Sequence, residues 1–292
     1  MQPSGTARSV ELIPATPQRL WGKPAVANFA LGGLGAGLYL AATVEVWLGA
    51  PGAVNVASWL GPALVVAGFI AVATEAGRPL RGPRVLVRLR TSWMSRELWV
   101  GGGFIVLAGA ELVFRLVWLR YPAAAAAIGL CLAQGWILRH ARGVAAWDVP
   151  LMPLVFLQSA IVSGTGLLVL VEVAAGRGLD GAFLIAAALG VVAGMLVWRG
   201  FVGWPGGPAF VRSTAALKSG RAGVVILAAG YLAPLLLGTL AVTLPTGGAG
   251  ALALGAILMV AGQVYAKAEL ILTAGQLRPI TLANLTLRRR TS

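Results

Sequence analysis

Residues that hold metals and redox cofactors are nearly absent from this sequence. Its 292 residues include one cysteine, Cys131, and one histidine, His140. One cysteine cannot form a disulfide within the chain, and it cannot hold an iron–sulfur cluster, which needs several thiolate ligands. One histidine excludes a haem held by two histidines of this chain. We therefore expect no haem, no iron–sulfur cluster and no metal site within the chain.

Charged residues are also scarce. They make up 11% of the chain, whereas a soluble domain carries roughly 25%. Hydrophobic residues make up 58%. This leaves too little polar surface to coat a water-soluble globule, so the composition predicts an all-α, polytopic membrane protein. The first twenty residues contain no apolar core, and we expect no signal peptide.

Acidic residues are the scarcest charged group. Asp and Glu number 9 against 23 Lys and Arg, which gives a net charge of +14. In a soluble chain, such a charge would suggest nucleic acid as a partner. Here the positive residues lie between apolar runs and follow membrane topology. We therefore expect contact with membrane lipid and none with nucleic acid.

Long apolar runs are what the sequence has in abundance. A run needs about 20 residues to cross the roughly 30 Å of hydrocarbon in a bilayer. Eight runs qualify, and they cover residues 24–48, 54–76, 93–119, 122–138, 150–174, 181–202, 222–244 and 249–275. We expect two four-helix bundles, in residues 24–139 and 140–275. A cytoplasmic segment (1–23) precedes them and a basic cytoplasmic tail (276–292) follows.

Glycines are concentrated in the first run, at Gly32, Gly33, Gly35 and Gly37. Small residues let membrane helices approach closely, so these positions predict tight helix packing. The alternative interpretation is a backbone groove for a flat ligand.

The positions of Lys and Arg predict the orientation of the chain. With eight spans, nineteen of them lie in the terminal segments and in the loops on the side of the termini. The opposite side has only Arg120 and Arg177 in loops, while Arg115 and Lys267 lie within spans. Basic loops stay in the cytoplasm. We therefore expect both termini to be cytoplasmic.

Several ionisable residues fall inside the predicted spans. Glu111 and Arg115 are four residues apart, a spacing that favours an ion pair on one helix face; a step on a proton route is the alternative. Glu45 and Glu172 lie near outer helix ends, where we expect them to be solvated. We expect Lys267 to extend to the cytoplasmic surface.

Two further contacts are open alternatives. Lys267 could instead contact Gln263 or Tyr265 inside the protein. Glu75, near an inner helix end, could pair with Arg78.

A group of polar residues is predicted at the cytoplasmic ends of spans one, three and four. Its members are Asn28, Arg96, Glu97, Gln134, Trp136, Arg139 and His140. Asn28 and Gln134 are amides within apolar runs, and buried amides need hydrogen-bond partners. Those partners could be each other, or equally the carbonyl groups of a bound quinone.

Three motifs in this sequence resemble one known family. Trp21 and the stretch NFALGGLGAG at 28–37 resemble the first span of the NrfD/PsrC family. TSWMSREL at 91–98 resembles the start of span three there and in the related DMSO reductase anchor subunit. AWDVPLMPLVFL at 146–157 resembles the entry to span five. The resemblance covers roughly residues 20–275. Residues 28–40 and 266–280 are also similar to membrane subunits of phenylacetyl-CoA:acceptor oxidoreductases.

The resemblance implies a function in electron transfer. The family provides the membrane subunit of complexes that also contain a molybdenum or tungsten pterin subunit and a ferredoxin-like iron–sulfur subunit. It exchanges electrons and protons with menaquinone or ubiquinone in the bacterial or archaeal cytoplasmic membrane. For this chain, the resemblance implies quinone binding at Asn28, Arg96, Gln134, Trp136 and Arg139.

One position departs from the family pattern. Some members have a histidine at the position that matches Asn28, and an asparagine does not titrate near neutral pH. Asn28 could therefore bind a quinone carbonyl but not deliver a proton. Glu97 and His140 are the better candidates for delivering the proton to the quinone, which is the catalytic step.

The loop before the third span predicts a docking surface. Arg84 and Arg88 precede the motif at 91–98 and Trp93 lies within it, and we expect these three residues to bind the iron–sulfur subunit. Attraction of anionic lipid is the alternative. Two other classes of function also remain open. The protein could be a transporter with a central polar pathway, or a purely structural membrane anchor.

Overall fold

The computed structural model describes residues 10–49, 52–74, 87–244 and 248–282. Within these ranges the protein is mainly helical, with two short strands, and eight helices are long and apolar enough to cross a membrane. The prediction of an all-α, multi-pass membrane protein with eight spans is therefore confirmed.

The spans agree with the predicted runs to within a few residues at most ends. The first four are α1 (Lys23–Trp47), α2 (Val54–Ala73), α4 (Trp93–Phe114) and α5 (Arg120–His140), the last preceded by the 3₁₀ turn η2 (Val117–Leu119). Next come α6 (Met152–Ala174) and α7 (Gly181–Val202). The seventh span joins α9 (Arg221–Leu227), the π-helical turn η3 (Ala228–Leu232) and α10 (Ala233–Thr243). The eighth joins α11 (Gly248–Ala268) and the π-helical turn η4 (Glu269–Thr273).

Local sequence signals fix several helix starts. Ser92 caps α4, where its side chain accepts a hydrogen bond from the Ser95 amide. Asp180 caps α7 by accepting from the amides of Ala182 and Phe183. Side-chain oxygens at this position satisfy backbone donors that the first helical turn leaves unpaired.

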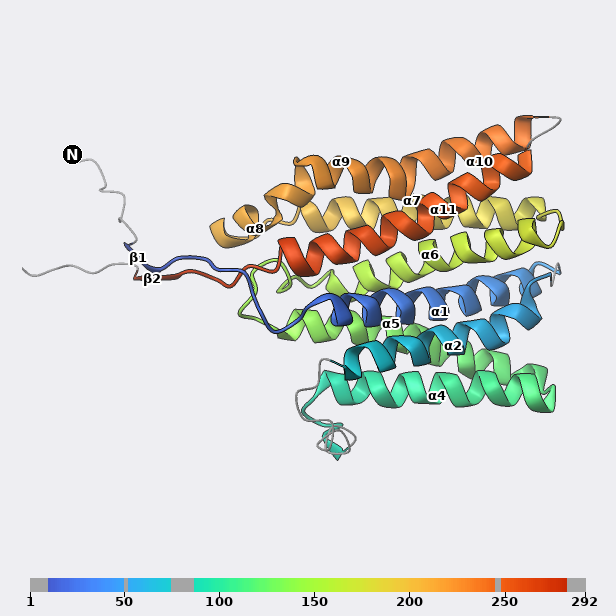
Figure 1. The fold of residues 1–292 in the computed structure, drawn as a ribbon, viewed down its shortest axis with the longest axis horizontal. Coiled ribbons are helices and arrows are strands. Elements are labelled where there is room, and N and C mark those ends of the chain that lie inside the picture. Colours follow the sequence, from blue (N-terminus) through green and yellow to red (C-terminus); the bar gives the residue numbers. More distant parts are fainter. Residues whose placement is uncertain (1–9, 50–51, 75–86, 245–247, 283–292) are drawn as a thin grey trace, which may run out of the picture.

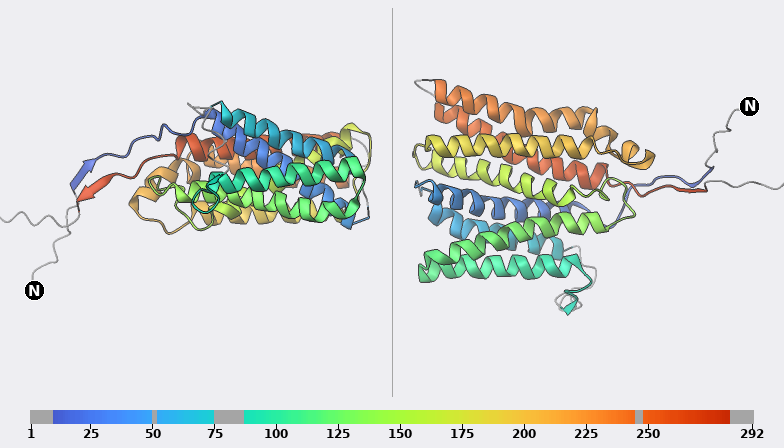
Figure 2. Two further views of the ribbon diagram at one scale, coloured as in Figure 1. Left: turned by 90° about the horizontal axis from the view of Figure 1, so that it is seen from below. Right: turned by 180° about the vertical axis from the view of Figure 1, so that it is seen from behind.

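The helices run side by side along the long axis of the molecule (Figures 1 and 2). In the first half, α1 packs against α2 and α5, and α4 packs against α5. In the second half, α6 packs against α7 and α11, and α10 packs against α11. The two halves meet because α6 also contacts α1 and α5.

The two ends of the described chain lie together at one end of the bundle, at the left of Figure 1. There β1 (Val10–Ile13) pairs antiparallel with β2 (Ile280–Leu282). The short helix α8 (Pro208–Lys218) lies at the same end. We call this the strand end and the other the opposite end. Because the chain has an even number of spans, its two ends must lie at the same end of the bundle.

The glycines of α1 serve close packing, one of the two interpretations of the sequence. A side chain at Gly37 would overlap the carbonyl group of Ala160 on α6, and one at Gly35 would overlap the carbonyl oxygen of Gly61 on α2. At Gly32 and Gly33, polar side chains from α5 and α11 approach α1 instead. These glycines therefore bring α1 to the centre of the molecule and leave room for polar groups beside it.

Candidate functional site

A buried carboxyl group lies between three helices near the strand end. Glu97 is in the second turn of α4, and only 6% of its surface is exposed. Its Oε1 accepts a hydrogen bond from Asn28 Nδ2 of α1 at 3.0 Å and from Gln134 Nε2 of α5 at 3.1 Å. The two amides therefore bind Glu97 and not each other. We call Asn28, Glu97 and Gln134 the amide triad.

The triad has acceptor atoms that remain unused. Asn28 Oδ1 and Gln134 Oε1 are buried and have no hydrogen-bond partner within the described residues. Glu97 determines how both amides are oriented. A carboxylate oxygen accepts hydrogen bonds, so each amide turns its NH₂ group toward Glu97 and its oxygen away. Gly32 makes room for Gln134, since a side-chain carbon there would lie 2.5 Å from Gln134 Nε2.

An aromatic cluster lies about one helical turn nearer the strand end than the amide triad does. The rings of Trp93 and Trp136 are stacked, with centroids 5.2 Å apart and an angle of 11° between their planes. The guanidinium carbon of Arg96 lies 4.2 Å from the Trp93 ring centroid, and that of Arg139 lies 4.5 Å from the Trp136 ring centroid. Such contacts use the negative face of the indole ring to hold a cation.

His140 completes this cluster and is exposed. Its ring lies 5.5 Å from both tryptophan rings. Trp93 Nε1 donates a hydrogen bond to His140 Nε2 at 3.3 Å, and His140 Nδ1 lies 2.9 Å from the carbonyl oxygen of Trp136. Both contacts are satisfied when the ring hydrogen is on Nδ1. We call Trp93, Arg96, Trp136, Arg139 and His140 the Trp–Arg cluster.

The predicted site residues thus fall into two neighbouring groups. The amide triad is buried in the helix bundle, whereas the Trp–Arg cluster lies at the ends of α4 and α5. Of the predicted docking residues, Trp93 belongs to the cluster and Arg88 is exposed just before α4. Arg84 lies outside the described residues, as does the proposed pair of Glu75 and Arg78.

A second buried carboxyl group, Glu111, has a different partner from the one predicted. α4 ends at Phe114, and Arg115 adopts a left-handed backbone conformation, with φ of 53°. The four-residue spacing between Glu111 and Arg115 therefore no longer places them on one helix face, and the predicted pair is wrong. Glu111 instead accepts hydrogen bonds from Arg120 of α5 and from the hydroxyl of Tyr39.

The sequence predicts that Arg120 lies in a loop, but the residue is buried at the start of α5. Besides Glu111, its guanidinium donates to Ser58 Oγ of α2 at 3.3 Å. We call Tyr39, Glu111 and Arg120 the arginine triad. Pro122 within the first turn of α5 was the available signal, because proline is tolerated there and the helix can begin before it.

The expectation that Glu45 and Glu172 are solvated is also wrong. Their exposed fractions are 3% and 1%. Glu172 binds Arg177, with its Oε2 2.6 Å from Arg177 Nε, and Glu45 accepts from the Ala53 amide at 3.3 Å. The short connections at the opposite end cover these carboxyl groups, and Arg177 follows Glu172 closely enough to neutralise it.

Lys267 does not extend to the surface, contrary to the prediction. Only 4% of it is exposed, and its Nζ donates to Ser159 Oγ of α6 at 2.7 Å. This partner is neither Gln263 nor Tyr265, the two alternatives. A side-chain carbon at Gly33 would lie 3.2 Å from Lys267 Nζ, so the ammonium group reaches the surface of α1.

Two comparisons with known proteins found no match. No family model matches the sequence, and no curated protein matches it. Among the residues that the structure describes, no three His, Cys, Asp or Glu side chains are grouped so that they could hold a metal ion.

Proposed function

We propose that this protein is the membrane subunit of an oxidoreductase complex and exchanges electrons between an iron–sulfur partner and a membrane quinone. The amide triad carries this proposal: it holds a buried carboxyl group between two neutral donors and leaves two buried acceptors unused. An ionisable group placed inside a membrane protein is a functional candidate by default.

The unused acceptors fit the head group of a reduced quinone. Its hydroxyl groups are hydrogen-bond donors, and the oxygens of Asn28 and Gln134 could accept from them. When bound, the quinone supplies the two-electron and two-proton chemistry. Asn28 and Gln134 position that head group, and their amide hydrogens keep Glu97 in place beside it.

Glu97 is suited to hold and release a proton at its carboxylate oxygens. Within the described residues its side-chain partners are the two neutral amides, so a change in its charge breaks no ion pair. His140 is exposed at the strand end, where it can exchange protons with water. The proposed route for protons therefore runs between Glu97 and the strand end.

The strand end is the proposed docking face for the ferredoxin-like iron–sulfur subunit. Arg88 is exposed there, and the Trp–Arg cluster adds two guanidinium groups. A basic surface favours an acidic partner and speeds its association. In this proposal, substrate chemistry occurs in a molybdenum or tungsten pterin subunit beyond the iron–sulfur subunit.

We propose that the strand end lies in the cytoplasm of a bacterial or archaeal cell. Both described chain ends lie there, as do Arg88, Arg139 and Arg142, and basic segments remain cytoplasmic. A reporter that is active only in the periplasm, fused after Ser292, should therefore be inactive. Activity of that fusion would reverse the orientation and remove the proposed docking face.

The quinone site is tested by two substitutions in the assembled complex. Glu97→Gln should leave quinone affinity within about twofold and lower turnover by about 100-fold or more, because a general acid–base group contributes at least that much. Asn28→Ala should weaken quinone affinity about 2- to 12-fold through the loss of one hydrogen bond. Steady-state kinetics with a water-soluble quinol measures both quantities.

Glu269→Gln is the matched control for Glu97→Gln, since Glu269 lies in η4, away from the triad. It should leave both kinetic constants unchanged. If Glu97→Gln and Asn28→Ala both show wild-type kinetics while the subunits still co-purify, the quinone site is not at the amide triad.

A further inference from the structure

The two described chain ends form a ribbon that projects from the strand end of the bundle. β1 and β2 pair with each other, and Ile13 lies opposite Ile280 across the pair. In Figure 1 and in both views of Figure 2, the two strands extend beyond the ends of the helices. We call residues 10–18 and 275–282 the ribbon.

Hydrogen bonds hold the base of the ribbon in place. The Gln18 amide donates to the Gly275 carbonyl oxygen at 2.8 Å, so the two segments are already paired where they leave the bundle. The Arg278 side chain donates to Asp148 Oδ2 at 2.7 Å and ties the ribbon to the loop before α6. A surface that is ordered in advance loses little conformational freedom when a partner binds.

The outer part of the ribbon exposes apolar side chains. Leu12, Ile13 and Ile280 are 55%, 52% and 53% exposed. Gln18 already precedes the first span, and Ile13 lies five residues further out, which is about 16 Å in an extended strand. The head groups of a bilayer occupy only about 5–8 Å on each side of the hydrocarbon. These side chains therefore lie in water beyond the lipid, where an apolar surface indicates a protein partner.

A groove with a volume of about 320 Å³ lies at the base of the ribbon, beside α8. Its lining includes Ala15, Leu277 and Pro279 of the ribbon, and Arg212, Ser213 and Ala216 of α8. Ile280 directly follows Pro279 in the chain. The groove therefore continues into the exposed apolar part of the ribbon.

A side pocket adjoins this groove. Its volume is about 110 Å³, and Ala145 and Ala209 line both spaces. Because they share these two residues, the groove and the side pocket form one surface that runs from the ribbon to the start of α8. Each residue of an extended segment spans about 3.3 Å, so several residues of a partner can lie along this surface.

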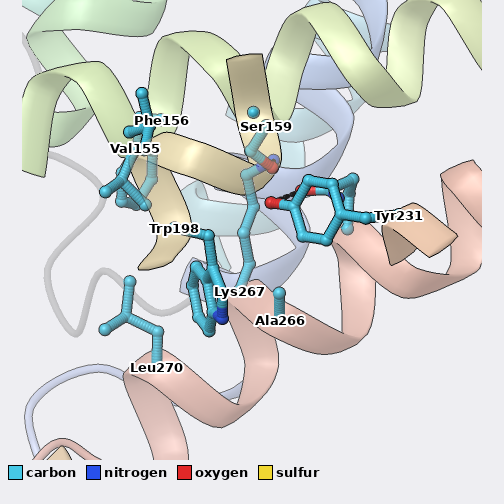
Figure 3. A pocket seen from close by; sticks show the side chains of 11 residues that line it. Val155, Phe156, Ser159, Trp198, Tyr231, Ala266, Lys267 and Leu270 are labelled. Atoms are coloured by element: carbon cyan, nitrogen blue, oxygen red, sulfur yellow. Dashed lines mark hydrogen bonds between the residues drawn. The ribbon is translucent and has the colours of Figure 1, made fainter. Parts of the chain in front are cut away.

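The cavity beside Lys267 offers no comparable surface. Figure 3 shows it between the helices, and its volume of about 10 Å³ leaves space for roughly one water molecule. A protein segment can bind at the groove beside the ribbon but not there.

The charges around the ribbon favour an acidic partner. The side chain of Arg212 is 57% exposed, and its ion-pair partner Glu11 is 3.8 Å away, too far for a hydrogen bond. Asp148 is already paired with Arg278. The sequence beyond the two strands, in residues 1–9 and 283–292, adds four arginines and no acidic residue. Complementary charge speeds association and helps to select the partner.

We propose that the ribbon and the groove at its base bind an extended segment of the iron–sulfur subunit. An acidic side chain of that segment pairs with Arg212, and its apolar side chains pack on Ile13 and Ile280. The identity of this partner rests on the proposed function. The ribbon and the Trp–Arg cluster lie at the same end of the bundle, so one subunit can contact both.

The test uses the iron–sulfur subunit released from the native complex by high salt. Its rebinding to washed membrane vesicles with the strand end outward is measured by titration. Ile13→Ser combined with Ile280→Ser should weaken rebinding at least about tenfold, because a few apolar side chains carry most of the affinity of such contacts. Arg212→Glu should weaken it by a similar factor at low salt and by less at high salt, since salt screens exposed charges.

Two substitutions at the same end of the bundle are matched controls. Arg221 is exposed at the start of α9 and lines neither the groove nor the side pocket, so Arg221→Glu makes the same change of charge elsewhere. Leu20 is 83% exposed and lies outside the ribbon, so Leu20→Ser removes an apolar side chain elsewhere. Both controls should rebind the subunit within about twofold of the wild type.

All four variants should elute as the wild type does in size-exclusion chromatography, because the changed side chains are exposed. Wild-type rebinding by the ribbon and Arg212 variants would overturn the proposal, and so would an equal loss in the two controls. A change in oligomeric state caused by the ribbon substitutions would assign this surface to a second copy of the chain instead.

Failure of this inference and failure of the proposed function give different results. If the wild-type protein purifies from its native membranes without an iron–sulfur subunit, the proposed function fails, and the partner inferred for the ribbon fails with it. If such a subunit is present and rebinds equally well to every variant, only the inference about the ribbon fails.

Discussion

The amide triad and the arginine triad are built from the same three helices. Each takes one residue from α1, one glutamate from α4 and one residue from α5. Glu97 and Glu111 are fourteen residues apart, which is nearly four helical turns, so they lie on one face of α4. Their exposed fractions, 6% and 7%, are almost equal.

The two glutamates differ in what surrounds them. Glu111 faces the guanidinium of Arg120 and forms an ion pair with it. Glu97 faces two amides that carry no charge. Burial is therefore a poor guide to function at these positions, and the charge of the partner distinguishes them. The arginine triad is suited to holding helices together, whereas the amide triad can accommodate a change of charge.

The largest effect is expected when the ion pair is broken on one side. Glu111→Gln leaves Arg120 buried without a counter-charge, which should lower the free energy of unfolding by about 3–5 kcal/mol. Unfolding of the purified protein, followed by circular dichroism in mixed micelles with increasing sodium dodecyl sulfate, measures this loss.

The matched control removes both charges. Replacing a whole buried ion pair by uncharged residues is often nearly neutral, so Glu111→Gln combined with Arg120→Met should recover most of the lost stability. Equal stability of the single variant and the wild type would mean that the ion pair does not hold this end of the bundle together.

A smaller effect is expected at the other glutamate. Glu97→Gln leaves no charge unpaired, since both partners are neutral, and the new amide oxygen can still accept a hydrogen bond. The free energy of unfolding should fall by no more than about 1.5 kcal/mol in the same assay. A loss as large as that of Glu111→Gln would show that Glu97 is also a structural residue and would weaken its proposed role with protons.

The spans were predictable because they depend on a local property. The length and apolarity of each run are read directly from neighbouring residues, and a membrane helix satisfies its own backbone hydrogen bonds. The residues of the amide triad could also be grouped from the sequence. Successive spans run in opposite directions, so the start of α1, the start of α4 and the end of α5 lie at the same depth in the membrane.

The partners of the buried charges were not predictable in this way. Glu111 binds Arg120 and not Arg115, because α4 ends one residue before Arg115 and α5 begins two residues earlier than its proline suggests. The contact of Lys267 with Ser159 joins residues 108 positions apart in sequence. Such pairs depend on how the helices pack, and the apolar pattern of these spans is nearly uniform around each helix.

The smallest expected effect concerns the contact between Gln134 and Glu97. Gly32→Ala should displace the Gln134 amide, because the new methyl group would lie within 2.5 Å of Nε2. The substitution has two opposing consequences. Alanine favours the helix over glycine by about 0.5–1 kcal/mol. Loss of one hydrogen bond costs about 0.5–1.5 kcal/mol, so the net change should be within about 1 kcal/mol.

Gly103→Ala separates these two contributions, since Gly103 lies in α4 with open space around it. It should show the helix-forming gain alone, and Gly32→Ala should therefore be less stable than Gly103→Ala by about 0.5–1.5 kcal/mol. In a Gln134→Ala background there is no amide to displace, and this difference should vanish. A difference that persists there would mean that Gly32 serves the packing of α1 and that the added methyl group does not act through Gln134.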